Sequence, residues 1–103
     1  MNRWRIPRWL EQEVLERDRC CVYCGSAFAG ADSSRGHKPS WEHIVNDAQL
    51  VTRENIARCC VSCNASKGAK NLRDWLGSSY CRRKGITEKD VARAVQDALG
   101  ALR

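Results

Sequence analysis

A duplicated cysteine segment constrains this chain more than any other feature. Residues 19–25 read Arg-Cys-Cys-Val-Tyr-Cys-Gly and residues 58–64 read Arg-Cys-Cys-Val-Ser-Cys-Asn, so five of the seven positions are identical. Each copy contains a C-x-x-C pair, Cys21/Cys24 in the first and Cys60/Cys63 in the second. Two-residue spacing lets a tight turn bring both thiolates to one ion, about 2.3 Å from each sulfur. The repeat therefore predicts a closed, tetrahedral four-cysteine site for structural Zn²⁺.

The other three cysteines leave the ligand assignment open. Cys20 and Cys59 each stand one residue before a pair and offer C-x-x-x-C spacing, so either could replace Cys21 or Cys60 as a ligand. The two-residue spacing is the closer match, and we expect Cys20 and Cys59 to pack near the site instead. Cys81 stands among basic residues, where we expect a free thiol. A redox-active C-x-x-C is disfavoured because the motif occurs twice and no βαβ pattern accompanies it.

Length and composition agree with a small metalloprotein. The chain has 103 residues, which predicts a single domain (1–103) with a thin apolar core that zinc would reinforce by about 10 kcal/mol. No apolar run approaches the roughly 18 residues needed to span a bilayer, and no secretory signal is apparent. Seven cysteines therefore indicate reduced thiols, and we expect a cytoplasmic protein with no membrane partner.

Positive charge is concentrated in one segment. The formal net charge is +6, and residues 64–84 carry six basic side chains against one acidic, which accounts for five of those six charges. The basic residues are Lys67, Lys70, Arg73, Arg82, Arg83 and Lys84. Such a field suits a phosphate backbone, DNA first with RNA not excluded, whereas the plainer alternative is a solvated basic helix face.

Hydrophobic spacing predicts an α+β layout. We expect helices over about 7–18, after Cys63 and over about 87–102, a turn-rich loop over 25–40, and short strands over 41–45 and 55–59. In the helix after Cys63, Lys67 and Lys70 should share a flank, and Gly77 should end it. The apolar stripe of the last helix is core or a partner face, with core favoured. Gly25 and Asn64, which follow the two pairs, are residue types that tolerate positive φ.

A second unusual cluster lies between the cysteine pairs. It comprises Glu42-His43-Ile44, then Glu54-Asn55-Ile56, then Asn64 directly after the second pair, and Lys67. Together with Arg17–Gly25 these residues resemble the zinc-bearing HNH endonucleases over about residues 14–76. The resemblance implies a small ββα-metal (HNH, His-Me finger) core with a four-cysteine zinc site and flanking N- and C-terminal helices.

The same resemblance implies a role for each residue. His43 would be the general base that takes a proton from water, and Asn55 would orient the loop or the ring of His43. Glu42 and Asn64 would hold a catalytic Mg²⁺ or Mn²⁺. Lys67, and with it Lys70, would contact phosphate.

These roles suit phosphodiester hydrolysis on chemical grounds. A divalent cation neutralises charge that develops on the phosphate, and Mg²⁺ prefers oxygen ligands such as a carboxylate and an amide. Histidine, with an ordinary pKa near 6.5, is largely neutral at pH 7 and can accept a proton. Such a base is worth about 10²–10⁴ in rate.

Each residue also has a structural alternative. His43 could be a half-buried strand histidine, and Glu42 a surface carboxylate paired with Arg53 or Arg58. Asn64 could be the turn residue that matches Gly25, and Asn55 could end a turn begun by Thr52. His37, in the loop, is expected to face solvent.

Three departures from the family pattern bear on activity. Glu42 stands where Asp is usual, and Asn46-Asp47-Ala48-Gln49 stands where the family has Pro and Gly-Gly, so Asp47 could supply a ligand. Neighbouring residues on a regular strand point to opposite faces. Glu42 and His43 can therefore share a site only if the strand ends or bulges between them.

Three functions follow from the sequence. The first is a metal-dependent HNH endonuclease that hydrolyses DNA and leaves 5′-phosphate and 3′-hydroxyl ends. The second is a zinc-stabilised nucleic-acid-binding module without cleavage. The third is an assembly partner whose last helix docks on a larger phage or restriction complex.

Overall fold

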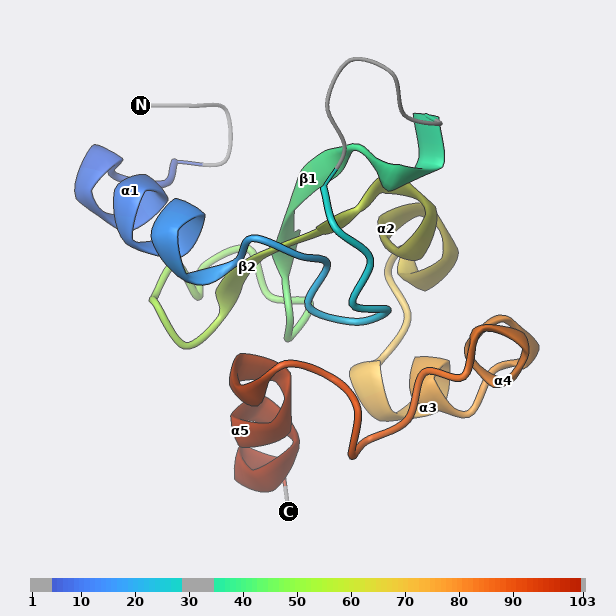
Figure 1. The fold of residues 1–103 in the computed structure, drawn as a ribbon. Helices are drawn as coiled ribbons and strands as arrows, with labels where there is room; N and C mark the ends of the chain where they lie inside the picture. Colours follow the sequence, from blue (N-terminus) through green and yellow to red (C-terminus); the bar gives the residue numbers. More distant parts are fainter. Residues whose placement is uncertain (1–4, 29–34, 103) are drawn as a thin grey trace.

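The computed structural model describes residues 5–28 and 35–102. The elements run α1 (Arg8–Arg17), η1 (Arg35–His37), β1 (Pro39–His43), β2 (Ile56–Cys60), α2 (Val61–Lys67), α3 (Leu72–Leu76), α4 (Ser79–Lys84) and α5 (Arg93–Ala101) (Figure 1). Within these ranges the fold is a two-stranded antiparallel sheet surrounded by short helices, which confirms the α+β class.

The first strand of the hairpin begins and ends two residues earlier than the sequence predicts. β1 pairs with β2 in a regular register that runs from Pro39↔Cys60 to His43↔Ile56. Beyond His43, the amide of Val45 donates to the Asn55 side-chain oxygen (2.7 Å) instead of continuing the ladder. The Ile44 amide still donates to the Asn55 carbonyl (2.9 Å), but the ladder ends there because the Asn55 side chain binds both the amide and the carbonyl of Val45.

The predicted single helix after Cys63 is two helices. α2 begins directly after β2, and Gly68, with φ +49°, separates it from α3. Lys67 lies in α2 and Lys70 in the connecting turn, so the prediction that they share one helix flank is wrong. Asn64 is helical, so it is not the counterpart of Gly25 in a turn, where φ is +77°. α4, which the sequence analysis did not predict, begins at the Ser78 cap.

The last helix is shorter than predicted. Residues Thr87–Asp90 form a turn closed by a hydrogen bond between the Thr87 hydroxyl and Asp90 (2.8 Å), and α5 starts at Arg93. The Ala92 amide donates to the Val22 carbonyl (2.9 Å), which connects the start of this helix to the loop of the first cysteine pair, Cys21–Cys24 (the first cysteine loop). The helix begins only after this tether.

The hairpin divides the buried apolar residues into two clusters. The smaller one joins Ile6, Leu10 and Val14 to Ile56 of β2. The larger one surrounds the two cysteine pairs, Cys21/Cys24 and Cys60/Cys63. It also includes the buried side chains of α3, α4 and α5, among them Trp75, Cys81, Val95 and Leu99. Val91, Val95 and Leu99 of the predicted apolar stripe are therefore core, whereas Leu102 at its end is 45% exposed, which leaves little of the stripe to support an assembly-partner role.

Candidate metal centre and active site

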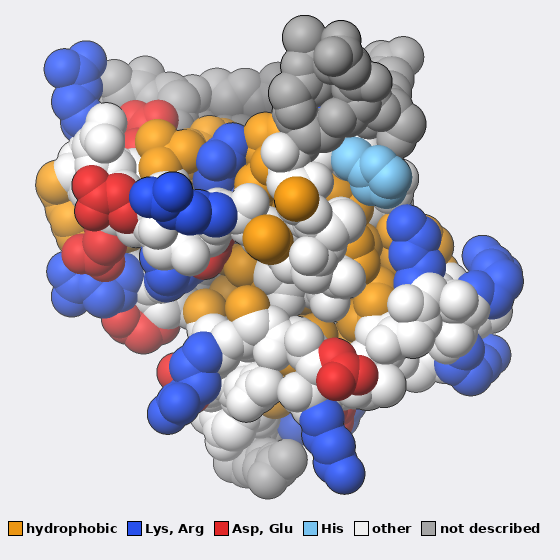
Figure 2. Space-filling model, viewed as in Figure 1, with side chains coloured by type: hydrophobic (Ala, Val, Ile, Leu, Met, Phe, Trp, Pro, Cys, Tyr) orange, Lys and Arg blue, Asp and Glu red, His pale blue; other side chains and the backbone are white. Residues whose placement is uncertain are grey.

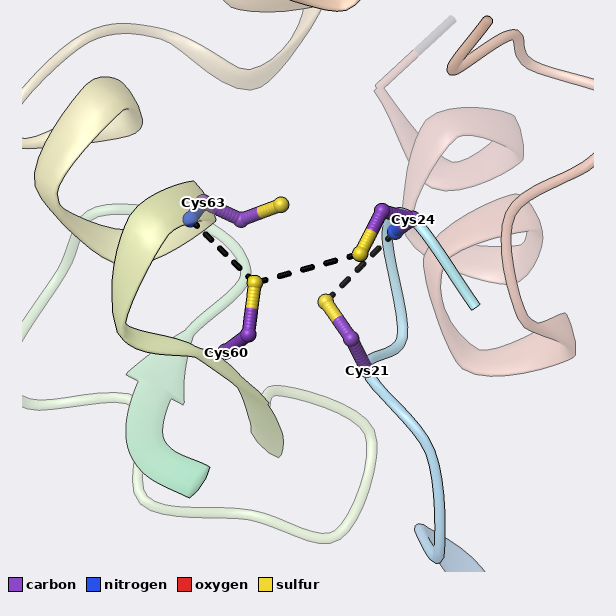
Figure 3. Close-up of side chains that lie close together, drawn as sticks. All are labelled: Cys21, Cys24, Cys60 and Cys63. Atoms are coloured by element: carbon purple, nitrogen blue, oxygen red, sulfur yellow. Dashed lines mark hydrogen bonds between the residues drawn. The ribbon is translucent and has the colours of Figure 1, made fainter. Parts of the chain in front are cut away.

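Four cysteine sulfurs converge between the first cysteine loop and the β2–α2 junction (Figure 3). The Sγ atoms of Cys21, Cys24, Cys60 and Cys63 all lie within 4.8 Å of one another. The Cys24 and Cys60 sulfurs are 3.8 Å apart. In a tetrahedral site with Zn–S bonds of about 2.3 Å, neighbouring sulfurs are about 3.8 Å apart. The cluster thus fits Zn²⁺, with the four ligands that the sequence predicts.

Backbone amides surround the sulfurs. The Cys21 sulfur accepts from the amides of Tyr23 (3.4 Å) and Cys24 (3.5 Å), and the Cys60 sulfur accepts from the Cys63 amide (3.4 Å). A side-chain hydrogen bond from Cys63 and the backbone amides of Tyr23, Cys24 and Cys60 lower the pKa of Cys21 to about 5, against the effect of burial. The pKa of Cys63 is raised, first by the same hydrogen bond and then by burial. The hydrogen bond between these two groups thus acts in opposite directions on their pKa values.

The remaining cysteines lie outside the cluster. Cys20 is exposed, so the expectation that it packs near the site is wrong. Cys59 is buried on β2, and desolvation raises the pKa of its thiol, which keeps it a neutral packing residue. Cys81 carries a free thiol as expected, but it is buried in α4.

A second polar cluster lies between β1 and α2, with Glu42 at its centre. The Glu42 Oε2 atom is 3.1 Å from Lys67 Nζ and accepts a hydrogen bond of 2.6 Å from the Tyr23 hydroxyl. Glu42 is 7% exposed and Lys67 1%. Lys67 also donates to the His43 carbonyl oxygen (3.3 Å). Glu42 is thus a buried, charge-paired carboxylate.

This arrangement corrects the alternative partners considered for Glu42. Arg53 pairs with Glu13 (2.6 Å). The Arg58 guanidinium lies over the rings of Phe28 (5.0 Å) and Trp41 (5.7 Å). Glu42 is therefore not a surface carboxylate held by either arginine.

Asn64 faces the same β1–α2 interface as Glu42. Its amide nitrogen donates to the Ser40 hydroxyl (2.6 Å) and to the Trp41 carbonyl (3.3 Å). Ser40 and Glu42 are two residues apart on β1, so their side chains lie on the same face of the strand. Asn64 and Lys67 are three residues apart on α2, so they lie on the same side of the helix. One carboxylate and one amide side chain thus lie on neighbouring positions of the same interface.

Asn55 holds the loop that follows His43. Its amide nitrogen donates to the carbonyls of Val45 (3.1 Å) and Leu50 (3.0 Å), and its oxygen accepts from the Val45 amide. Its own backbone amide donates to the Thr52 carbonyl (3.0 Å), so it also closes the local turn. Asn55 was expected to orient either the loop or the ring of His43, and these contacts are all with the loop.

The strand is regular through Glu42 and His43, with no bulge between them. His43 shares its sheet face with Ile56, its register partner, whereas Glu42 points toward α2. His43 is, however, the last residue of β1, so it lies at the end of the sheet, where Lys67 contacts its carbonyl.

Asp47 is exposed, and its carboxylate accepts from the Gln49 amide (3.0 Å). His37 is exposed, as expected.

The basic segment is only partly available at the surface. Lys67 is buried against Glu42, and Arg73 pairs with Glu88 (3.2 Å). Arg82, Arg83 and Lys84 are exposed along α4, and Lys70 is exposed in the turn before α3. Figure 2 shows Lys and Arg side chains gathered over the part of the molecule where Figure 1 places α4. The surface charge of this segment therefore comes mainly from α4.

Sequence reasoning missed Tyr23 as a site residue. Its hydroxyl contacts Glu42, and its ring packs edge-on against Trp75, with centroids 4.8 Å apart. One signal was available, because Tyr23 occupies one of the two positions at which the repeated segments differ, opposite Ser62.

One known protein resembles most of this chain. Over 90 residues, or 84% of the chain, it is 30% identical to the CRISPR-associated endonuclease Cas9 of Corynebacterium diphtheriae. The match spans only 8% of the length of that relative. No protein-family model matches the chain. No solved structure matches it significantly. The similarity suggests a nuclease-related domain.

None of the helices in the described ranges is both long enough and apolar enough to cross a bilayer.

Proposed function

We propose that this chain is a small, zinc-stabilised HNH endonuclease that hydrolyses DNA with one divalent cation and leaves 5′-phosphate and 3′-hydroxyl ends. The observation that carries the proposal is the hairpin–helix unit, in which His43 ends β1, Asn55 braces the following loop, and Glu42 and Asn64 face one interface. The similarity to a curated endonuclease supports it independently.

The donor groups fit a hard cation in kind. Glu42 would supply a carboxylate oxygen and Asn64 its amide oxygen, since the amide nitrogen of Asn64 already donates to Ser40 and Trp41. When bound, Mg²⁺ or Mn²⁺ would neutralise charge on the scissile phosphate. Lys67 Nζ lies 3.1 Å from Glu42 Oε2, so the bound cation would share the carboxylate with this ammonium.

His43 would act as the general base, accepting the proton of the attacking water at the end of β1. Asn55 would keep the loop after His43 in place and so hold the imidazole in a constant position. Lys70 and the exposed cations of α4 would hold the phosphate backbone. Lys67 would contact phosphate only after its ammonium leaves Glu42.

A plasmid assay tests the proposal. The parent protein, His43→Ala and His37→Ala are each loaded with zinc and incubated with Mg²⁺, Mn²⁺ or EDTA. His37 is the matched control because it is the other histidine of the chain and is exposed. We expect metal-dependent cleavage by the parent and by His37→Ala, and a loss of about 10²–10⁴ in rate in His43→Ala. Equal cleavage by all three would reject His43 as the base.

The ion pair between Lys67 and Glu42 favours a second candidate, a nucleic-acid-binding zinc module that does not cleave. In that case Lys67 would serve permanently as the counter-charge of Glu42. The parent protein would then bind DNA with strong salt dependence, because phosphate contacts release counterions, and it would not cleave with any metal.

A further inference from the structure

Tyr23 connects the cysteine cluster to Glu42. It lies between the predicted zinc ligands Cys21 and Cys24, and its amide donates to the Cys21 sulfur (3.4 Å). Its side chain is buried, with 1% of its surface exposed, and its hydroxyl donates to Glu42 Oε2 across 2.6 Å. A single side chain thus spans from the first cysteine loop to the candidate active site.

The ring of Tyr23 is held on more than one side. Trp75 packs edge-on against it, with centroids 4.8 Å apart. Its backbone conformation depends on the loop that the cysteine sulfurs define, because two amides of that loop donate to Cys21. The cysteine loop and the packing against Trp75 therefore both help to place the hydroxyl beside Glu42.

Among the described residues, the two polar contacts to the Glu42 carboxylate both fall on Oε2. One comes from Tyr23 and the other from Lys67 Nζ (3.1 Å). The hydroxyl and the ammonium therefore hold the carboxylate through Oε2, and Oε1 is the oxygen that neither of these two contacts uses.

We propose that Tyr23 is a positioning residue through which the zinc-bound loop orients Glu42 for the divalent cation. The proposal rests on the proposed function in taking Glu42 as a cation ligand, with Oε1 as the ligand atom. Partners that hydrogen-bond a metal ligand typically change metal affinity by about 10–100-fold when removed. Zinc loss would release the Tyr23 hydroxyl and so weaken the second metal site as well.

The test compares Tyr23→Phe with Tyr80→Phe. Both remove one hydroxyl and keep the ring, but the Tyr80 hydroxyl donates to the Cys63 sulfur (3.3 Å) rather than to Glu42. Zinc content is measured first. Mn²⁺ affinity is then measured from the electron paramagnetic resonance signal of free Mn²⁺, alongside the Mn²⁺ concentration for half-maximal plasmid cleavage.

We expect Tyr23→Phe to retain zinc and to need at least about tenfold more Mn²⁺ for both binding and half-maximal cleavage. The rate at saturating Mn²⁺ should change less than the Mn²⁺ requirement. Tyr80→Phe should instead lose zinc more readily to a chelator. An unchanged Mn²⁺ affinity in zinc-loaded Tyr23→Phe overturns the proposal.

A second measurement tests the proposal even if the Tyr23→Phe variant does not fold. The chain has two tyrosines, so 3-fluorotyrosine labelling gives two ¹⁹F signals, which Tyr80→Phe assigns. Mg²⁺ should shift the Tyr23 signal in the otherwise unaltered protein and leave the Tyr80 signal in place. A Tyr23 signal that does not move at saturating Mg²⁺ overturns the proposal.

The outcomes separate this inference from the proposed function. Cleavage that depends on Mn²⁺ but not on Tyr23 rejects the inference alone. Mn²⁺ binding that weakens in Tyr23→Phe, without cleavage by the parent protein, rejects the nuclease and supports the inference. A parent protein that neither cleaves nor binds Mn²⁺ overturns both.

Discussion

Replacement of Lys67 by methionine should destabilise the protein strongly. Lys67 is 1% exposed and lies 3.1 Å from the Glu42 carboxylate, which is itself 7% exposed. Lys67→Met keeps most of the side-chain volume but leaves a nearly buried carboxylate with only the Tyr23 hydroxyl as a close donor among the described residues. Removing one partner of a buried ion pair typically costs about 3–5 kcal/mol. We expect a decrease of that size in the free energy of unfolding.

Urea unfolding at pH 7 and a fixed excess of zinc measures this decrease by circular dichroism. Lys70→Met is the matched control, because Lys70 is exposed and its ammonium donates to the Ser66 carbonyl (3.0 Å) rather than to a carboxylate. Its cost should stay within about 0.5 kcal/mol. Combining Lys67→Met with Glu42→Gln removes both charges and should recover at least about 2 kcal/mol.

A cost of less than about 1 kcal/mol for Lys67→Met, or a cost no larger than that of Lys70→Met, would contradict this expectation at equal zinc content. Either result would mean that the ion pair contributes as little as an exposed one. Failure of the double variant to recover stability would show instead that the destabilisation comes from packing of the lysine side chain.

Cys24→Ser should lose zinc to a chromophoric chelator and unfold at far lower urea than the parent, whereas Cys20→Ser should match the parent, since the Cys20 thiol lies outside the cluster. Burial raises the pKa of Tyr23 well above 10, so the folded protein keeps a proton that the unfolded chain releases. The free energy of unfolding should therefore be unaffected by this group below pH 10 and fall above it by up to about 1.4 kcal/mol per pH unit, a slope that Tyr23→Phe reduces in alkaline urea titrations. Arg82→Gln combined with Lys84→Gln should weaken DNA binding for all sequences and reduce the slope of log affinity against log salt by about 0.9 for each phosphate that the protein no longer neutralises, as filter binding or fluorescence anisotropy can measure.

The cysteine cluster was predictable because ligand chemistry is local. A C-x-x-C pair fixes the distance between two sulfurs almost regardless of what surrounds it, and its repetition supplies the other two ligands. The strand that precedes the second pair was also predicted to within one residue, at Ile56–Cys60.

α1 lies at Arg8–Arg17, close to its predicted bounds, but the boundaries of some other elements were less predictable because distant contacts decide them. α5 starts at Arg93 rather than near Thr87, since the Ala92 amide is bound by the Val22 carbonyl from the first cysteine loop. Likewise, β1 ends at His43 because Asn55, twelve residues later, binds the Val45 amide. Neither partner is visible in local hydrophobic spacing.

The sequence by itself determined the chemistry available to this protein: four thiols with zinc spacing, a carboxylate next to a histidine, the amides of Asn55 and Asn64, and an excess of basic residues. Only the tertiary structure decided how these groups are used. Lys67, which the sequence groups with the basic surface, is buried as the counter-charge of Glu42, and Tyr23 reaches Glu42 from the cysteine loop. The physical reason is that a carboxylate becomes costly to leave unpaired once it is buried, and burial is set by the packing of β1 against α2 rather than by any local pattern.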